Sequence, residues 1–341
     1  HLGLRFASQA VRAVMPGLSD VAARIVGRRS AGLCRRGQGD AVGRCRRGRA
    51  GHVRHTSDVA GASTFSKFDA AAKAATFSLV FDAGLPMWEK LAEMVEREAQ
   101  RPTRLLDVGS GPGEPGCYLA ARLGCAAVVS DVVPPMVAAA GRRIEARGSR
   151  GVEARELDLQ DLSSLEPESF DLVSSAHAYP FALDKPRALA EALRVLRPGG
   201  LFAGVVWKSF ELLPLAGAML GAVTGTPPSP PPEGAPPPPP VSLGDREAFE
   251  GLLSGAGFEP RSWTEDEVTF AIDDEDLAAK YCALPVWDRL TELSQGPIPD
   301  AWERYAAAWP EVCAARGHLS DAGFTIGGVY CVAVARKPAA S

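Results

Sequence analysis

The sequence has no clustered cysteines. Its seven cysteines are scattered along the chain, without a Cys-x-x-Cys pair and without a histidine at ligand spacing beside any of them. A zinc site and a disulfide framework both need such clusters, so neither is indicated and no metal is expected. The longest apolar run, Leu212 to Val223, is well short of the roughly 18 residues that indicate a transmembrane helix, so no transmembrane segment is expected.

Residues 1–54 have very few acidic side chains and no lysine. They contain twelve arginines, with Asp20 and Asp40 as the only acids, so they carry a formal charge of about +10 while the remainder carries about −14. This composition is typical of an organelle transit peptide, and we predict that residues 1–61 are a targeting segment for a plastid or a mitochondrion. A disordered basic tail on an otherwise cytoplasmic protein and a nucleic-acid-binding arm are the alternatives. Because the first residue is His1 rather than Met, we expect the natural chain to start upstream.

From residue 62 to residue 208 the hydrophobic pattern predicts a regular alternation of elements. Residues 62–101 predict helices, one of which, 88–100, has a clear apolar face. The next predicted strands are 104–108, 126–131, 152–157, 170–176 and 201–208, and the helices between them are 115–124, 134–148 and 185–200. Strands that alternate with helices at this spacing indicate a parallel sheet covered on both faces.

After this alternation comes a proline-rich stretch. Residues 226–241 contain ten prolines and predict an exposed polyproline II-like loop, because proline neither donates to a ladder nor continues a helix. The loop is either a spacer between the core, 102–225, and the C-terminal part, 242–341, or a docking motif for a proline-binding partner. The C-terminal part predicts a helix over 245–257, helices between 274 and 317, and strands over 263–272 and 327–337 that complete the sheet.

The stretch LLDVGSGPGEPG, residues 105–116, predicts a strand, a glycine-rich turn and the start of a helix. Such a turn presents backbone N–H groups at a helix N-terminus and holds a ligand close to the main chain. The G-x-G-x-x-G pattern of Gly111–Gly116 fits a dinucleotide, so an NAD(P)-dependent oxidoreductase is one candidate. Asp131 ends the next strand and can accept hydrogen bonds from both hydroxyls of a ribose in either kind of ligand.

Four neighbouring residues favour a different ligand. Asp107 and Glu114 would repel an anionic pyrophosphate, whereas they would attract the ammonium and sulfonium groups of S-adenosylmethionine. Pro112 and Pro115 also remove two N–H donors that a pyrophosphate would use. The loop therefore predicts S-adenosylmethionine as the cofactor.

Several motifs in order carry a family resemblance. They are LLDVGSGPG, VVSD followed by PPMVAAA, ELDLQDL, SFDLVSSAHA, ALAEALRVLRPGG and AFEGLLSGAGF. With them the chain resembles, from about residue 62 to 337, a class I S-adenosylmethionine-dependent methyltransferase of the small-molecule type, similar to the ubiquinone and menaquinone biosynthesis methyltransferases. The resemblance implies a Rossmann-like α/β fold, with a seven-stranded, mostly parallel sheet, helices on both faces and a helical lid. It also implies a transferase of class EC 2.1.1.- that methylates a small molecule and needs no nucleic acid.

The resemblance further implies which residues bind the cofactor. Residues around the methionine part would be Asp107, Gly109, Ser110, Gly111, Gly113, Ser175 and Ala176. Residues around the nucleoside would be Asp131 at the ribose, Val132 against the adenine, Asp158 at the adenine amino group and the Leu159 backbone at a ring nitrogen. Asp158 alternatively caps a turn in DLQDLSSL.

Ligands of open α/β sheets bind beyond the carboxyl ends of the strands, which places 175–179, Trp207 and Lys208 around the reactive methyl. His177 is the candidate general base, because imidazole titrates near neutral pH, and Tyr179 is a candidate for binding or deprotonating a substrate hydroxyl. Alternatively, His177 orients the substrate or fills the wall, because methyl transfer can proceed through proximity and desolvation alone.

The acceptor itself is less well defined. Segments 65–80 and 212–223, with the helices around Trp287 and Trp302, are predicted to form the lid, and their apolar content indicates a lipophilic acceptor. The sequence does not separate O- from C- or N-methylation. It lacks the [D/N]-P-P-[Y/F] stretch of nucleic-acid amino methyltransferases and the cysteine trio of arsenite methyltransferases. A catalytically silent, methyltransferase-like subunit that binds a partner remains the alternative from another functional class.

Overall fold

Strands form one central sheet in the order β3-β2-β1-β4-β5-β8-β6, and the two-residue strand β7 pairs with β8 at its margin. The strands are β1 Arg104–Val108, β2 Ala126–Asp131, β3 Val152–Glu156, β4 Phe170–Ala176, β5 Leu196–Phe210, β6 Glu259–Ile272, β7 Leu319–Ser320 and β8 Gly323–Arg336. The first five are parallel to one another, and β8 is antiparallel to both β5 and β6. The predicted seven-stranded, mostly parallel sheet, finished by a reversed hairpin, is confirmed.

The computed structural model describes residues 70–98, 101–227, 232 and 234–339, all of which belong to one unit, Ala60–Ser341. The predicted targeting segment, 1–61, and the beginning of the predicted lid segment 65–80 lie outside the described residues. No helix within the described ranges is long and apolar enough to cross a membrane.

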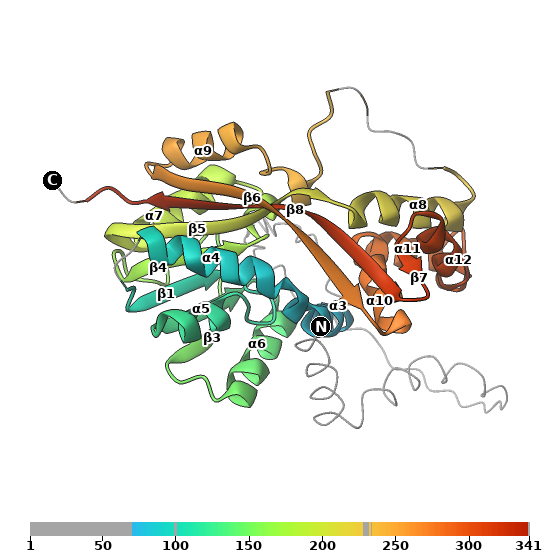
Figure 1. Ribbon diagram of the computed structural model, residues 1–341, viewed down its shortest axis with the longest axis horizontal. Coiled ribbons are helices and arrows are strands. Elements are labelled where there is room, and N and C mark those ends of the chain that lie inside the picture. The colour runs from blue at the N-terminus through green and yellow to red at the C-terminus, as the bar shows by residue number, and fades with distance from the viewer. Residues whose placement is uncertain (1–69, 99–100, 228–231, 233, 340–341) are drawn as a thin grey trace, which may run out of the picture. The chain divides into compact units, whose positions relative to one another are not determined.

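Helices cover both faces of the sheet. Helices α7 and α9 pack on one face, and α4, α5 and α6 on the other, while α8 and α10 to α12 gather around the far ends of β6 and β8 (Figure 1). The helices are α3 Ala70–Val80, α4 Leu85–Glu98, α5 Gly116–Leu123, α6 Pro134–Arg147, α7 Lys185–Val195, α8 Leu212–Thr224, α9 Arg246–Gly255, α10 Glu275–Ala283, α11 Trp287–Ser294 and α12 Ala301–Ala315. Short 3-10 turns are η1 Phe81–Gly84, η2 Tyr179–Phe181, η3 Pro239–Val241 and η4 Leu284–Val286.

Two hydrophobic clusters lie on the opposite faces of the sheet. Successive side chains of a strand point to opposite faces. Leu105 of β1 therefore joins the first cluster, which contains Trp88 of α4, while Leu106 joins the second cluster, which contains Phe170 and residues of α7. Both leucines have no exposed surface. The inner strands are therefore buried on both sides, as expected for a sheet covered on both faces, whereas the edge strands β3 and β6 are partly exposed.

Helix α7 differs from its prediction at the C-terminal end. It begins as predicted, because the Asp184 side chain accepts a hydrogen bond from the Arg187 backbone N–H. It ends at Val195, however, and not at Gly200 as predicted. Leu196 already pairs with Phe170 of β4, so the Pro-Gly-Gly residues belong to the start of β5.

Of the described residues in the proline-rich loop, 226–227, 232 and 234–239 are exposed, whereas Pro240 and Val241 are half-buried. Pro238 has φ and ψ of −60° and 151°, which is the polyproline II region. The chain then enters η3, which packs on β5. The loop thus returns to the sheet just before α9.

Candidate functional site

The carboxyl ends of the parallel strands meet along one edge of the sheet. Val108 of β1 is in register with Ser130 of β2, and Ala176 of β4 is in register with Val205 of β5. The glycine loop after β1 therefore lies between the end of β2 and the end of β4. This is the edge where open α/β sheets bind their ligands.

Glycines allow the loop to lie close to the sheet. Gly109, Gly111 and Gly113 have φ of 68°, 54° and 104°, a region that other residues rarely adopt. A Cβ added to Gly109 would lie 2.2 Å from the Cβ of Ala178, so no larger residue fits beside the segment that follows β4. The first residue of α5, Gly116, is as restricted, since its Cβ would lie 2.5 Å from Val129.

Asp107 is the carboxylate at the base of this loop, and it is 0% exposed. One oxygen accepts the Gly116 backbone N–H at 2.9 Å, and the other accepts the Ser174 hydroxyl at 2.5 Å. Burial raises the pKa of Asp107 to about 7, although these hydrogen bonds oppose the shift. The carboxylate therefore ties the loop to β4, and its contact with the methionine part of a ligand stays a prediction.

Asp131 lies at the end of β2, where the ribose-binding residue is predicted. Its Oδ2 accepts the Gly111 backbone N–H at 2.9 Å, and its Oδ1 accepts the Val133 backbone N–H at 2.9 Å. Burial raises its pKa, against the opposing effect of these hydrogen bonds. The structure thus brings Asp131 directly to the glycine loop. The Ser110 hydroxyl, by contrast, points inward to the Asp107 carbonyl oxygen.

The residues predicted at the adenine follow β2 and β3. Val132 is 50% exposed, an unusual position for a large apolar side chain. The Oδ1 of Asp158 accepts the Gln160 backbone N–H at 2.8 Å, so Asp158 caps its own turn. Turn capping is the alternative to cofactor binding that the sequence predicts for this residue. Leu159 packs against the second cluster. Contacts of these residues with an adenine remain predictions.

The end of β4 holds the next predicted pair. Ala176 is buried in the first cluster. Ser175 is buried as well, and its hydroxyl has no hydrogen-bond partner among the described residues. Buried hydroxyls are seldom left unpaired, so Ser175 is a group that a ligand could satisfy.

His177 follows β4 and turns the chain with φ of 62°. Its ring stacks on Trp207 of β5 with a centroid distance of 4.6 Å and an interplanar angle of 8°. Trp207 stacks in turn on Phe210 at 4.3 Å and 1°. Three parallel rings thus stand beside the carboxyl ends of β4 and β5, and we call His177, Trp207 and Phe210 the aromatic stack.

The ring nitrogens of His177 are buried and have no hydrogen-bond partner in the described part of the chain. Burial lowers the pKa of His177 to about 3. The imidazole is therefore neutral at pH 7 and takes up a proton poorly. This geometry favours the orienting role of His177 over the general-base role.

Two other predicted neighbours of the reactive methyl lie elsewhere. Tyr179 is buried in the second cluster, edge-on to Phe202, and its hydroxyl has no partner among the described residues. Lys208 is exposed and pairs with Glu265. The register of β5 against β8 shifts between Trp207 and Ser209, so Lys208 is the extra residue of an irregular step, and Trp207 and Phe210 reach the stack while Lys208 does not. The positions of Tyr179 and Lys208 do not support their predicted roles.

The loop carries a second acid, Glu114, which is 2% exposed. Its Oε1 pairs with Arg147 and, at 3.2 Å, with Arg143, both on α6. The two arginines compensate the charge of Glu114. The prediction that Glu114 attracts the cationic groups of the cofactor is therefore not supported. Arginines 29 and 33 residues away in the sequence give no local signal of this pairing.

Two aromatic residues that the sequence analysis did not place at the site cover the loop. A Cβ on Gly111 would lie 3.8 Å from the Phe81 ring, and Phe81 stacks on Trp88 at 5.6 Å. Trp88 lies 6.4 Å from His177, and its indole N–H is buried without a partner in the described residues. The amphipathic pattern of α4 identifies Trp88 only as a core residue.

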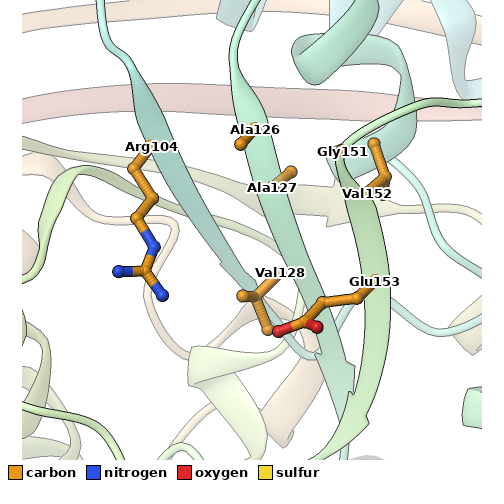
Figure 2. A pocket seen from close by; sticks show the side chains of 7 residues that line it. All are labelled: Arg104, Ala126, Ala127, Val128, Gly151, Val152 and Glu153. Atoms are coloured by element: carbon orange, nitrogen blue, oxygen red, sulfur yellow. The ribbon is translucent and has the colours of Figure 1, made fainter.

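A hollow of about 400 Å³ lies elsewhere on the sheet. Figure 2 shows Arg104, Ala126 and Gly151 among its lining residues, at the amino ends of β1 and β2 and just before β3. Parallel α/β sheets bind their ligands at the opposite ends of the strands. This hollow is therefore unrelated to the glycine loop.

The residues at the glycine loop fit S-adenosylmethionine. Asp131 offers a carboxylate beside the loop, and Trp88 and Ser175 carry buried polar groups that lack a protein partner in the described ranges. The aromatic rings offer an apolar surface next to these groups. Donors, an acceptor and an apolar wall together suit a nucleoside that carries an amino acid part.

Comparison with known proteins agrees with the geometry. Residues 106–204 match the family described as a methyltransferase domain. A demethylmenaquinone methyltransferase of Thermus thermophilus is 31% identical over 199 residues, which cover 54% of this chain and 86% of that protein. A malonyl-[acyl-carrier protein] O-methyltransferase of Geobacter sulfurreducens is 32% identical over 191 residues, covering 54% of this chain and 67% of that one.

A similar solved structure is phosphoethanolamine N-methyltransferase 2 of Haemonchus contortus in complex with S-adenosylhomocysteine. It is 17% identical, covers 74% of this chain and 53% of its own, and has a TM-score of 0.42. The sequence relatives decide the assignment, because the chain spans most of the Thermus protein. The chain belongs to the class I S-adenosylmethionine-dependent methyltransferases.

Proposed function

We propose that the chain methylates a small, mainly apolar metabolite at the carboxyl ends of β4 and β5. The observation that carries this proposal is the aromatic stack, whose three rings stand parallel at 4.6 Å and 4.3 Å. Flat aromatic walls favour planar or apolar ligands. The cofactor supplies an electrophilic methyl group on its sulfonium, so the site needs chiefly to orient the acceptor.

The apolar helices beyond the stack support the same acceptor class. Helices α8 and α10 to α12 bury mostly aliphatic and aromatic side chains around the C-terminal end of β6 and the N-terminal end of β8. Trp207 lies edge-on to Phe270 of β6 at 6.1 Å, so the stack continues into this region. We propose that these helices form the wall of the acceptor site.

We also propose that the acceptor needs no proton acceptor from the enzyme. His177, with its pKa near 3, stays neutral, and Tyr179 lies in the other hydrophobic cluster. An acidic hydroxyl or an enol, which is partly ionised at neutral pH, would react through proximity and orientation alone. His177 would then hold or orient the acceptor through a ring nitrogen.

The names of two relatives are in line with such acceptors. The Geobacter protein is named for O-methylation, and so is a 27-O-demethylrifamycin SV methyltransferase of Amycolatopsis mediterranei, 27% identical over 267 residues. The Thermus relative is named for demethylmenaquinone. Because two of these names specify an oxygen, we propose O-methylation over C-methylation; the acceptors that they name differ, from a malonyl group to rifamycin SV, and do not define the acceptor further.

An acceptor screen tests the proposal. The chain is incubated with S-adenosylmethionine and matched pairs of apolar and polar phenols, enols and quinols, and S-adenosylhomocysteine release is measured. Methyl transfer to the apolar, acidic acceptors is the expected result, and mass spectrometry of the product identifies the methylated atom. Turnover confined to polar amines would refute the proposal, and cofactor binding without turnover on any acceptor would favour the silent subunit.

We further propose that the protein works in a plastid or a mitochondrion. The proposal rests on the arginine-rich, acid-poor composition of residues 1–54. A fluorescent protein fused after residue 61 should enter one of these organelles. A diffuse cytoplasmic signal from this fusion would contradict the proposal.

A further inference from the structure

A network of charged residues surrounds Glu114 in the glycine loop. Its Oε2 accepts the Tyr118 backbone N–H at 2.8 Å, which fixes the side chain to the first turn of α5. Its Oε1 pairs with Arg143 and Arg147 on α6. A buried carboxylate with two guanidinium partners and a backbone donor is fully compensated, so it holds the loop, α5 and α6 in one arrangement.

The same two arginines also reach the segment that covers the loop. Arg143 donates to Asp82 of η1 at 2.5 Å, and Arg147 lies 3.3 Å from the same carboxylate oxygen. Arg143 further donates to the Ser78 carbonyl oxygen of α3 at 3.3 Å. Each arginine therefore bridges one acid of the loop and one acid of the covering segment, α3 and η1.

The covering segment closes the approach to the loop. It places Phe81 over Gly111 and against Trp88. A cavity of about 130 Å³ beside this segment, α4 and α5 is lined by Asp82, Leu85, Trp88, Glu114, Tyr118 and Arg147, none of which is a predicted cofactor residue. Because the Phe81 ring would be in van der Waals contact with a Cβ built on Gly111, we infer that α3 and η1 move aside when a nucleoside binds against the loop.

The two ends of the network differ in exposure. The Asp82 side chain is 62% exposed, whereas that of Glu114 is 2% exposed. Exposed ion pairs contribute little and are screened by salt, while removing a partner from a buried carboxylate is costly. When the segment opens, the pairs with Asp82 should therefore break while those with Glu114 persist.

We propose that Asp82, Arg143 and Arg147 form a latch that holds α3 and η1 over the cofactor and sets how fast the cofactor leaves. Arg143 and Arg147 are positioning residues, because they act on the ligand through Glu114 and the loop. The inference rests on the proposed function only in taking S-adenosylmethionine and its demethylated product as the ligands.

The test compares ligand release in the full chain and in three variants. Asp82→Asn removes the charge at constant size, Asp82→Glu restores it, and Arg246→Gln removes an exposed ion pair with Glu250 on the opposite face of the sheet as a control. Binding and release of S-adenosylmethionine and S-adenosylhomocysteine are followed by stopped-flow tryptophan fluorescence, for which Trp88 is the reporter. Thermal unfolding establishes that each variant is folded.

Asp82→Asn should release both ligands about threefold to tenfold faster, Asp82→Glu should restore the rate within about twofold, and Arg246→Gln should match the wild type. High salt should speed release from the wild type and narrow the difference. Release from Asp82→Asn at the wild-type rate would overturn the latch while leaving the cofactor assignment intact. Failure of the wild type to bind either ligand would overturn both.

Discussion

Asp107→Asn tests whether a buried carboxyl group at the glycine loop makes stability depend on pH. Asp107 has no exposed surface, and burial raises its pKa from 3.8 to about 7. Asparagine has the same shape and can still accept the Gly116 N–H, while the Ser174 hydroxyl can rotate to accept from the amide. The substitution therefore removes the titration with little change in packing.

The sign of the effect follows from proton linkage. Between pH 3.8 and 7 the folded chain holds a proton on Asp107 that the unfolded chain has released. Folding therefore takes up a proton in this range, and the free energy of unfolding falls as the pH rises. The contribution is absent below pH 3.8 and reaches its full, destabilising size above pH 7.

The magnitude follows from the same shift. A difference of about three pKa units corresponds to roughly 4 kcal/mol, of which roughly 2 to 3 kcal/mol develop between pH 5 and pH 8. Urea unfolding followed by tryptophan fluorescence at pH 5, 6, 7 and 8 measures this directly. Wild type should lose that much stability relative to Asp107→Asn across the series.

Parallel stability profiles of the two proteins would refute the reasoning, because they would mean that Asp107 titrates at the same pH in the folded and unfolded chains. A wild type that loses stability relative to Asp107→Asn as the pH falls would also contradict it. That result would mean that hydrogen-bond donors lower the pKa of Asp107 more than burial raises it. Ser174→Ala serves as a matched control. It removes the hydroxyl that donates to Asp107, so the loss between pH 5 and pH 8 should grow.

Four further predictions concern single residues. Asp131→Ala should weaken S-adenosylmethionine binding by roughly 1 to 3 kcal/mol through lost charged hydrogen bonds, and unchanged affinity in titration calorimetry would remove it from the site. His177→Ala should lower turnover with little change in cofactor affinity, and the wild-type pH–rate profile should show no limb near pH 6.5 from this residue, whose pKa is about 3. Trp207→Leu should raise the KM of an apolar acceptor about tenfold while cofactor affinity in calorimetry stays within about twofold, because one ring of the stack is lost. Gly109→Ala should lower the free energy of unfolding by roughly 2 kcal/mol or more, because alanine is strained at this left-handed φ and its Cβ would clash with Ala178. A variant that unfolds at the same urea concentration as the wild type would contradict this.

The strands and helices and their alternation along the chain follow from local patterns and could be predicted from the sequence. Short apolar strands, helices with an apolar face and the turn residues between them are all signals within a few residues of one another. The glycine loop is equally local, because its positive φ values require glycine. Asp131 could be predicted because the carboxyl ends of parallel strands share one edge of the sheet and consecutive strands are more often neighbours than not.

The contacts that complete the site depend on segments far apart in the chain. Asp82 and Arg143 are 61 residues apart, and neither position carries a motif. Trp88 could be identified as a core residue of α4, but its stacking toward Phe81 depends on the turn η1. The positive φ of His177 has no sequence signature either, and it decides which side chains after β4 reach the aromatic stack.

The structure also changes the physical reason for the choice of cofactor. Glu114 is paired with two arginines and Asp107 titrates near neutral pH, so the two acids repel a pyrophosphate less than their sequence positions indicate. The stronger obstacle is that the N–H groups of the loop are already used within the protein. The Gly116 N–H donates to Asp107 and the Gly111 N–H to Asp131.

The first turn of α5 offers no better cradle. The Cys117 N–H donates to the Gly113 carbonyl oxygen at 2.9 Å, and the Tyr118 N–H donates to Glu114 at 2.8 Å. A dinucleotide phosphate relies on such free donors at a helix N-terminus, and here it would have to displace buried carboxylates to obtain them. S-adenosylmethionine brings no phosphate and can bind beside the loop without breaking these bonds. The glycine pattern therefore serves close packing of the loop, and the N–H donors of Gly111, Gly113, Gly116, Cys117 and Tyr118 are occupied by the protein's own oxygens.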